Sequence, residues 1–330
     1  GVWCVVPAFS NHLIFENFKV YNNVGYGEDD GIDVNGCQDV VVRNSISINW
    51  DDPYSTKTER DGFEINAGWG SAEGKVTVND NILFDDCISW TGCYGFKVGQ
   101  GIGYDQSNIT VQNSTVYDCA VGFGIHHKRY DGFISNVLFD NITVENITRQ
   151  NEDHKMWFQC LLQDSNGQAV DGDMISNVVV KNINVLARST TSPKMVSRRD
   201  GSNISGVTFE NIRMYGSTAP ASSLGQLGFT TDSNNPLLSG SADKSRGHVY
   251  NANNYGIVGT TSSKIPGVYY NNSGNVFATE NEETAYGGMV VRLTGGNAAF
   301  YNMVDFGSGL DAMTVRYASD VADADRKSVV

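Results

Sequence analysis

Basic residues are scarce in this sequence: 23 Lys and Arg residues stand against 37 Asp and Glu residues, and the formal net charge is −14. A chain this acidic repels phosphate groups, so we expect neither nucleic acid nor an anionic membrane as a partner. A run of 18 apolar residues is also missing, which excludes a transmembrane helix.

Cysteine is too sparse, and too scattered, for a disulfide scaffold or a zinc cluster. The chain has six cysteines in 330 residues, and no two of them form a CxxC pair. Unpaired cysteine packs like a small apolar residue, so we expect buried free thiols.

What the sequence has in abundance is a short repeated pattern with a shared asparagine. The pattern runs apolar, any residue, Asn, apolar or Ser, any residue, apolar, as in "LFDNITV" and "VVKNINV". Repeats at intervals of about 20–50 residues indicate a stacked architecture, and β-branched residues at alternate positions indicate strands. The shared residues, which we expect to stack at turns, are Asn17, Asn44, Asn81, Asn113, Asn141, Asn182 and Asn211.

A second pattern lies between copies of the first: "DGIDVN" at 30–35, "DGFEIN" at 61–66, "YGFKVG" at 94–99 and "VGFGIH" at 121–126. Units of two or three short strands cannot bury their apolar faces alone, so they must stack on one another. The sequence therefore predicts an all-β fold with a right-handed parallel β-helix over residues 1–235. The repeat is already under way at residue 1, so we expect N-terminal coils to be missing.

Residues 236–330 form a different unit, which begins with a linker rich in Ser, Gly and Asn. The "GGNAAFYNMVDFG" segment and the later "VRYAS" resemble the first part of a family 6 carbohydrate-binding module. That resemblance implies a β-sandwich, and the chain is too short to complete it. We therefore expect an incomplete sandwich module.

Acidic residues gather on one predicted face of the β-helix. In "GIDVN", Ile32 and Val34 point into the core, so Asp33 and Asn35 are expected to point outward. Rungs lie about 4.8 Å apart, and carboxylates this close raise one another's pKa, which marks a candidate site rather than a solvated face. The predicted face carries Asp30, Asp33, Asp61, Glu64, Tyr94, Lys97, His126 and Lys128, with Asp51 and Asp52 in a neighbouring loop and Trp69 available to stack on a sugar ring.

The spacing of three aspartates resembles glycoside hydrolase family 28, the polygalacturonases. Trp3 and Pro7 match an early motif, Asp30 precedes a glycine, and Asp51 and Asp52 follow 21 and 22 residues later. The resemblance implies a secreted, inverting enzyme that acts on a polysaccharide without a cofactor, which we expect to be monomeric. It also implies that Asp51 is the general acid and that Asp30 and Asp52 activate the water.

The sequence departs from the family pattern at several motifs. Tyr94 stands where the family has a His, and Gly124 and His126 stand where it has the Arg and Lys that bind a uronate carboxylate. The segment "PYSTKTER" also follows Asp52 as an apparent insertion. These departures favour a neutral or modified glycan over plain polygalacturonate.

Two other functions stay open. The same face resembles family 9 pectate lyases, which implies calcium held by Asp30, Asp61 and Glu64, and Lys97 as a base whose pKa is lowered. A β-helix that binds a glycan without cleaving it would need no aspartate triad.

Overall fold

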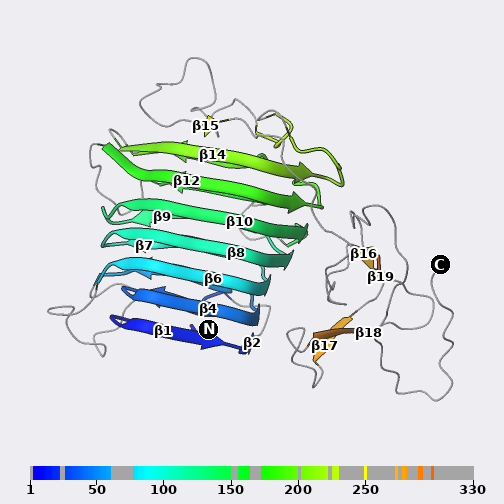
Figure 1. The fold of residues 1–330 in the computed structure, drawn as a ribbon, viewed down its shortest axis with the longest axis horizontal. Coiled ribbons are helices and arrows are strands. Elements are labelled where there is room, and N and C mark those ends of the chain that lie inside the picture. The colour runs from blue at the N-terminus through cyan, green and yellow to red at the C-terminus, as the bar shows by residue number, and fades with distance from the viewer. Residues whose placement is uncertain are drawn as a thin grey trace.

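The computed structural model describes residues 3–22, 27–60, 77–149, 155–163, 172–199, 202–221 and 225–229, and the backbone of short strands between 249 and 300. The described residues contain strands and no helix, and none of them forms a helix long and apolar enough to cross a membrane. The strands stack in register as successive coils of a parallel β-helix (Figure 1), so the predicted fold is confirmed.

One wall of the helix is a nine-stranded sheet, which we call the long sheet. Each of its strands pairs in parallel with the strand one coil away, in the order β1-β4-β6-β8-β10-β12-β14-β15, and β2 also pairs with β4. Its strands are β1 (Asn11–Glu16), β2 (Lys19–Tyr21), β4 (Gln38–Ile48), β6 (Asn79–Trp90), β8 (Gln106–Asp118), β10 (Ile134–Asn146), β12 (Gly172–Val185), β14 (Ser202–Met214) and β15 (Val249–Tyr250).

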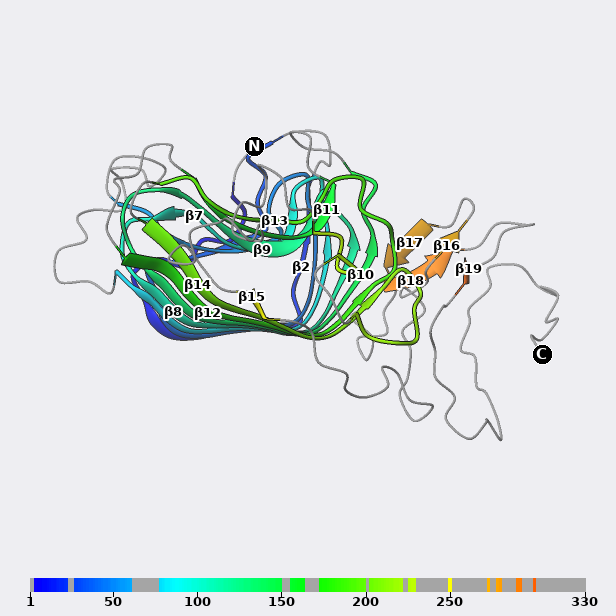
Figure 2. The same ribbon diagram turned by 90° about the horizontal axis from the view of Figure 1, so that it is seen from above.

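The opposite wall is a six-stranded parallel sheet, the short sheet, ordered β13-β11-β9-β7-β5-β3. Seen along the stack, the long strands run along one side and curve round toward the short sheet (Figure 2). The strands of the short sheet are β3 (Ile32–Asn35), β5 (Tyr54–Thr58), β7 (Tyr94–Ile102), β9 (Val121–Arg129), β11 (Met156–Leu162) and β13 (Lys194–Ser197).

Apolar side chains from both walls fill the space between the sheets. Phe123 on β9 packs against Phe139 on β10 with ring centroids 4.8 Å apart, and Phe158 meets Phe209 at 5.3 Å. Aromatic rings bury large areas and favour tilted or edge-on contacts, so these pairs tie one sheet to the other. The same packing repeats from coil to coil, and it holds the coils together as one body.

The repeated asparagines all have a left-handed backbone conformation, which an Asn tolerates better than most residues. Their amides form ladders between coils: Asn141 donates to Asn113 at 2.9 Å, and Asn211 donates to Asn182 at 2.8 Å. The prediction of a structural role for them is therefore confirmed.

One asparagine belongs to a different column from the one predicted. There are two left-handed columns, and Asn81 lies in the first, where its amide donates to Asp39 at 2.7 Å. In the second column, the place between Asn44 and Asn113 is taken by Asp86. The sequence pattern could not separate the columns because both precede an apolar strand residue.

The cysteines of the described residues are all free, as expected. Cys37, Cys87, Cys119 and Cys160 are buried, whereas Cys93 is partly exposed and Cys4 is exposed. Beyond the β-helix, the described backbone pairs β16 (Asn272–Ser273) with β19 (Ala299–Phe300), and β17 (Phe277–Glu280) with β18 (Met289–Arg292). The predicted carbohydrate-binding module otherwise lies outside the described residues.

Candidate active site

The segment "PYSTKTER" is not an insertion, as the sequence comparison had suggested, but supplies a strand of the short sheet. Strand β5 pairs with β3 on one side and with β7 on the other, so both of its edges are occupied. Ser55 therefore lies in register between Asp33 and Lys97. The repeat pattern had predicted Glu64 of "DGFEIN" at this position. The prediction that residues 61–66 form this rung is wrong, and Asp61, Glu64 and Trp69 lie outside the described residues.

The turn between β4 and β5 brings Asp51 and Asp52 back to the start of β3. The carboxylate of Asp29 accepts hydrogen bonds from the backbone amides of Trp50 at 3.2 Å and Asp51 at 2.8 Å. The side chain of Asn49 donates to the backbone oxygen of Asp29 at 2.7 Å. Asp29, which the sequence reasoning did not single out, thus anchors the Asp51–Asp52 pair across one full coil.

Asp30 and Asp52 lie on adjacent coils. The amide of Gly31 donates to the backbone oxygen of Asp52 at 2.9 Å. A Cβ atom on Gly31 would collide with the Ser47 hydroxyl and the Pro53 carbonyl, so this close approach of the two coils needs a glycine. Both carboxylates are almost fully covered, with residue exposures of 2 % for Asp30 and 1 % for Asp52.

Two buried lysines neutralise these carboxylates. The ammonium of Lys57 lies 2.7 Å from Asp30 and 3.0 Å from Asp33. The ammonium of Lys97 lies 2.6 Å from Asp52. Asp30 and Asp52 are therefore paired with different ammonium groups, and Asp30 shares its ammonium with Asp33. Lys57 was missed from the sequence because the segment that carries it resembled an insertion.

Asp33 does not point to solvent as predicted. It is fully buried, and one of its oxygens accepts a hydrogen bond from Ser55 and forms an ion pair with Lys57. The simple alternation of strand residues fails here because neighbouring chain covers both faces of β3, where all four residues are buried. These interactions of Asp33 therefore do not favour the prediction that it binds the substrate.

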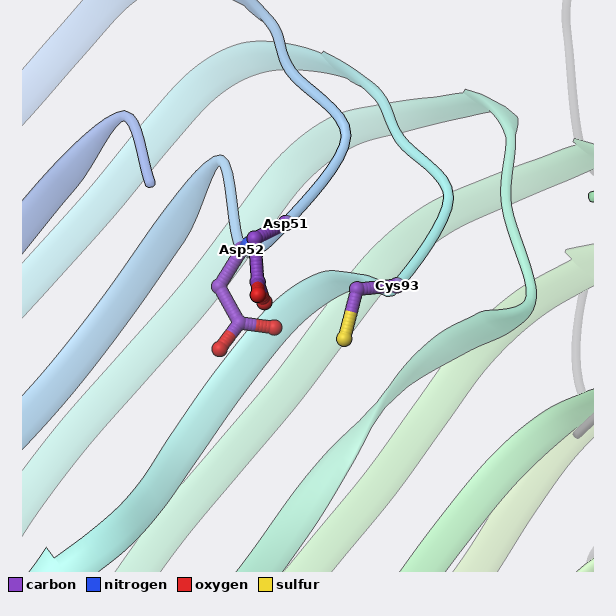
Figure 3. Close-up of side chains that lie close together, drawn as sticks. All are labelled: Asp51, Asp52 and Cys93. Carbon is purple, nitrogen blue, oxygen red and sulfur yellow. The ribbon is translucent and has the colours of Figure 1, made fainter. Parts of the chain in front are cut away.

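Asp51 is the more exposed member of the aspartate pair, and it lies beside a thiol. Ligand atoms of Asp51, Asp52 and Cys93 lie within 4.8 Å of one another, and their side chains lie side by side in Figure 3. These atoms could in principle hold a metal ion. The ammonium of Lys97 already neutralises Asp52, however, and burial raises the pKa of the Cys93 thiol well above its usual value. The charge balance of this cluster does not favour a cation.

The three aspartates differ in their electrostatics. Burial and the neighbouring Asp33 raise the pKa of Asp30 well above its usual value, although Lys57 opposes the shift. Burial also raises the pKa of Asp52, against the effect of Lys97. Burial alone would raise the pKa of Asp51 too, but Lys97 and the amide of Glu28 lower it overall.

Lys97 does not have the lowered pKa expected of a catalytic base. Burial alone would lower its pKa, but Asp52, Cys93 and Asp51 together raise it well above the usual value. Lys97 is thus an ammonium ion. The carboxylate of Asp30 likewise forms an ion pair with the Lys57 ammonium, instead of being free to bind calcium. For the part of the proposed calcium site that the structure describes, these contacts do not favour a cation.

The column next to these residues carries neutral groups. Lys97 stands in register with Gly124, and Gly124 with Gln159. The side-chain amide of Gln159 donates a hydrogen bond to the Tyr94 hydroxyl. His126 stacks on Tyr94 with ring centroids 6.1 Å apart, and its ring bonds to Gln163 at 2.7 Å. Lys128, two residues further along β9, is half-buried.

A family model settles what kind of protein this is. The model of glycosyl hydrolases family 28 matches residues 3–227, which is more than half of the chain and spans both sheets from β1 to β14. The chain belongs to glycosyl hydrolase family 28. The resemblance found in the motifs around Asp30, Asp51 and Asp52 is therefore confirmed at the level of the family.

Among solved structures, the chain is similar to a hyperthermoactive exopolygalacturonase from Thermotoga maritima. The two are 17% identical, with a TM-score of 0.39, and the match covers 66% of this chain and 50% of that chain. The chain thus spans half the length of that protein. A comparison with curated proteins finds no match.

The structure shows the surroundings of the residues at which the sequence departs from the motifs of family 28. Tyr94, in the place of the family His, is buried, and burial raises its pKa well above the usual value. At Gly124, in the place of the family Arg, a Cβ atom would collide with the backbone oxygen of Gln159. Tyr, Gly and His therefore stand where the family pattern has His, Arg and Lys.

Proposed function

We propose that this protein hydrolyses glycosidic bonds of a polysaccharide, with Asp30, Asp51 and Asp52 as the catalytic residues. The observation that supports this most is that Asp30 and the Asp51–Asp52 turn lie on adjacent coils, joined by the Gly31 amide to the Asp52 carbonyl, in a member of family 28. Asp30 lies just before β3, and Asp51 and Asp52 lie in the turn before β5. The charges of Asp51 and Asp52 both raise the pKa of Asp30.

The proposed reaction inverts the anomeric centre. One carboxyl group protonates the leaving glycosidic oxygen, while carboxylates on the other side take a proton from the attacking water. We assign Asp51 as the acid and Asp30 with Asp52 as the base pair. An acid must hold its proton, whereas Lys97 lowers the pKa of Asp51. We therefore propose that the bound glycan covers the half-buried Asp51 and raises its pKa by excluding water.

We propose a neutral glycan as the substrate. A uronate needs a cation beside its carboxylate, and the two ammonium groups at the junction are already bonded to Asp30 and Asp52. The partly exposed His126 carries an imidazole instead, a group that suits sugar hydroxyls.

The proposal is tested by measuring reducing-end release from dextran, α-1,3-glucan, xylan and polygalacturonate. We expect cleavage of a neutral glycan, equal rates with and without chelator, and no ultraviolet absorbance from an unsaturated product. Cleavage that needs calcium and produces this absorbance would instead show a lyase.

The variant Asp51→Asn is expected to lose activity by a factor of about 10² to 10⁴, the usual contribution of a general acid. The matched control is Asp140→Asn, which changes the same group on the long sheet, where Asp140 accepts a hydrogen bond from Asn182 at 2.7 Å. An Asp51→Asn protein that keeps its activity would refute the proposed catalytic set. Binding of a glycan by the wild type without any cleavage would show a binding protein.

A further inference from the structure

We propose that Lys57 is a positioning residue for the reaction: its buried ammonium holds the carboxylate of Asp30 in place and keeps that carboxylate apart from the charge of Asp33. This inference rests on the proposed function, because it assumes that Asp30 takes part in catalysis.

The position of the Lys57 ammonium is determined from three sides. It lies 2.7 Å from an oxygen of Asp30, 3.0 Å from an oxygen of Asp33, and 3.5 Å from the centre of the Trp3 ring. A cation over an aromatic face gains further attraction when water is excluded. Lys57 is 3 % exposed, so this flexible side chain has little room to move.

The scaffold around Lys57 is fixed as well. The residue lies on β5, between β3 and β7, and stands in register with Asn35. Its backbone oxygen accepts hydrogen bonds from the amide of Gly36 at 3.1 Å and from the side chain of Asn79 at 2.9 Å. The ammonium is thus carried by a strand that cannot shift without breaking its pairing with both neighbouring strands.

The charges around Asp30 explain why a cation is needed there. Asp33 on β3 and Asp51 and Asp52 in the turn before β5 all raise the pKa of Asp30, and Lys57 on β5 opposes them. Like charges gathered in a buried place favour protonation, and a protonated Asp30 could not accept a proton from water. Lys57 therefore holds the geometry of Asp30 and favours its ionised form.

Asp33 opposes the electrostatic effect of Lys57 on Asp30. It is buried, and one of its oxygens has no hydrogen-bond partner among the described residues. Its negative charge acts on Asp30 in the opposite direction from Lys57. Replacing Lys57 or Asp33 should consequently shift the ionisation of Asp30 in opposite directions, which a purely structural role would not produce.

The test compares Lys57→Met, Asp33→Asn and the double variant, using the glycan that the wild type cleaves fastest in the panel above. We expect Lys57→Met to lower kcat about 100-fold through misplacement of Asp30, with KM changed less than twofold. The acidic limb of the kcat/KM profile should move to higher pH in Lys57→Met and to lower pH in Asp33→Asn. The double variant, which loses both charges, should lie between the two.

A second readout needs no substrate. Titration of the Asp30 carboxyl carbon by NMR in protein labelled with ¹³C-aspartate should show the same opposite shifts, with the Asp30 signal assigned by its loss in Asp30→Asn. If Lys57→Met does not fold, Asp33→Asn and the double variant decide the question by the same two measurements.

The outcomes separate this inference from the proposed function. An active Asp30→Asn enzyme would overturn the proposed function, and Lys57 would then have no catalytic group to position. An inactive Asp30→Asn enzyme together with folded Lys57 and Asp33 variants whose limbs do not move, or move in the same direction, would overturn only the role of Lys57.

Discussion

The long sheet and the short sheet are made by the same coils, yet they use polar residues in opposite ways. On the long sheet, left-handed asparagines recur from coil to coil, and several donate to the asparagine of the neighbouring coil. On the short sheet, charged residues lie buried between coils and do not repeat. The regular wall is what stabilises the stack, and the irregular one is where chemistry is expected.

The largest effect is expected on the short sheet, from breaking one buried ion pair. Lys97→Met leaves the Asp52 carboxylate buried without its ammonium, which costs about 3–5 kcal/mol of folding free energy. The double variant Lys97→Met/Asp52→Asn removes both charges and should return close to the stability of the wild type while remaining inactive. Urea denaturation checks both, and equal stability of the single and double variants would contradict the comparison.

A smaller effect is expected when one step of an amide ladder is removed. Asn113→Ala loses the bonds to Asp85 and Asn141 and puts alanine, which tolerates the left-handed conformation less well than asparagine, at this position, at a cost of about 1–2 kcal/mol. Asn113→Gly loses the same bonds without the backbone penalty, so it should cost less. Both variants should keep full activity in the reducing-end assay, and a loss of activity would show that the two walls are not separable.

The smallest effect is expected at the surface of the long sheet. Arg43 and Glu16 form an ion pair at 2.6 Å, but the Arg43 side chain is 46% exposed, so water screens the pair. Arg43→Ala should change the unfolding free energy by less than about 1 kcal/mol. A larger loss in urea denaturation would place this pair alongside the buried ones.

Much of the long sheet could be predicted because its signals are local. Asn141 and Asn182 each precede an apolar strand residue, and a left-handed Asn forms the same turn wherever the pattern recurs. The exchange of Asn81 for Asp86 was missed because two columns share one sequence pattern. The error left the fold unchanged, since either column implies the same stacking.

The short sheet was harder to predict because its strands interrupt the pattern. Strand β5 reads "YSTKT", where Ser55 and Lys57 replace the glycine-led motif of the other rungs, so its register followed only from the pairing with β3 and β7. Asp33 was placed outward by strand alternation, but neighbouring chain covers it. Lys97 was a candidate base only under the lyase alternative, and its contact with Asp52 favours its ammonium form.

The sequence alone determined the parallel β-helix and singled out the three aspartates of the proposed site, because a repeated strand pattern and the Asp30, Asp51 and Asp52 spacing are properties of the chain. Only the tertiary structure decided which groups meet. Asp29 anchors the turn that carries Asp51, and Lys57 and Lys97 pair with Asp30 and Asp52. These contacts join residues on adjacent coils, and the length of each coil, which sets the register, cannot be read from local pattern.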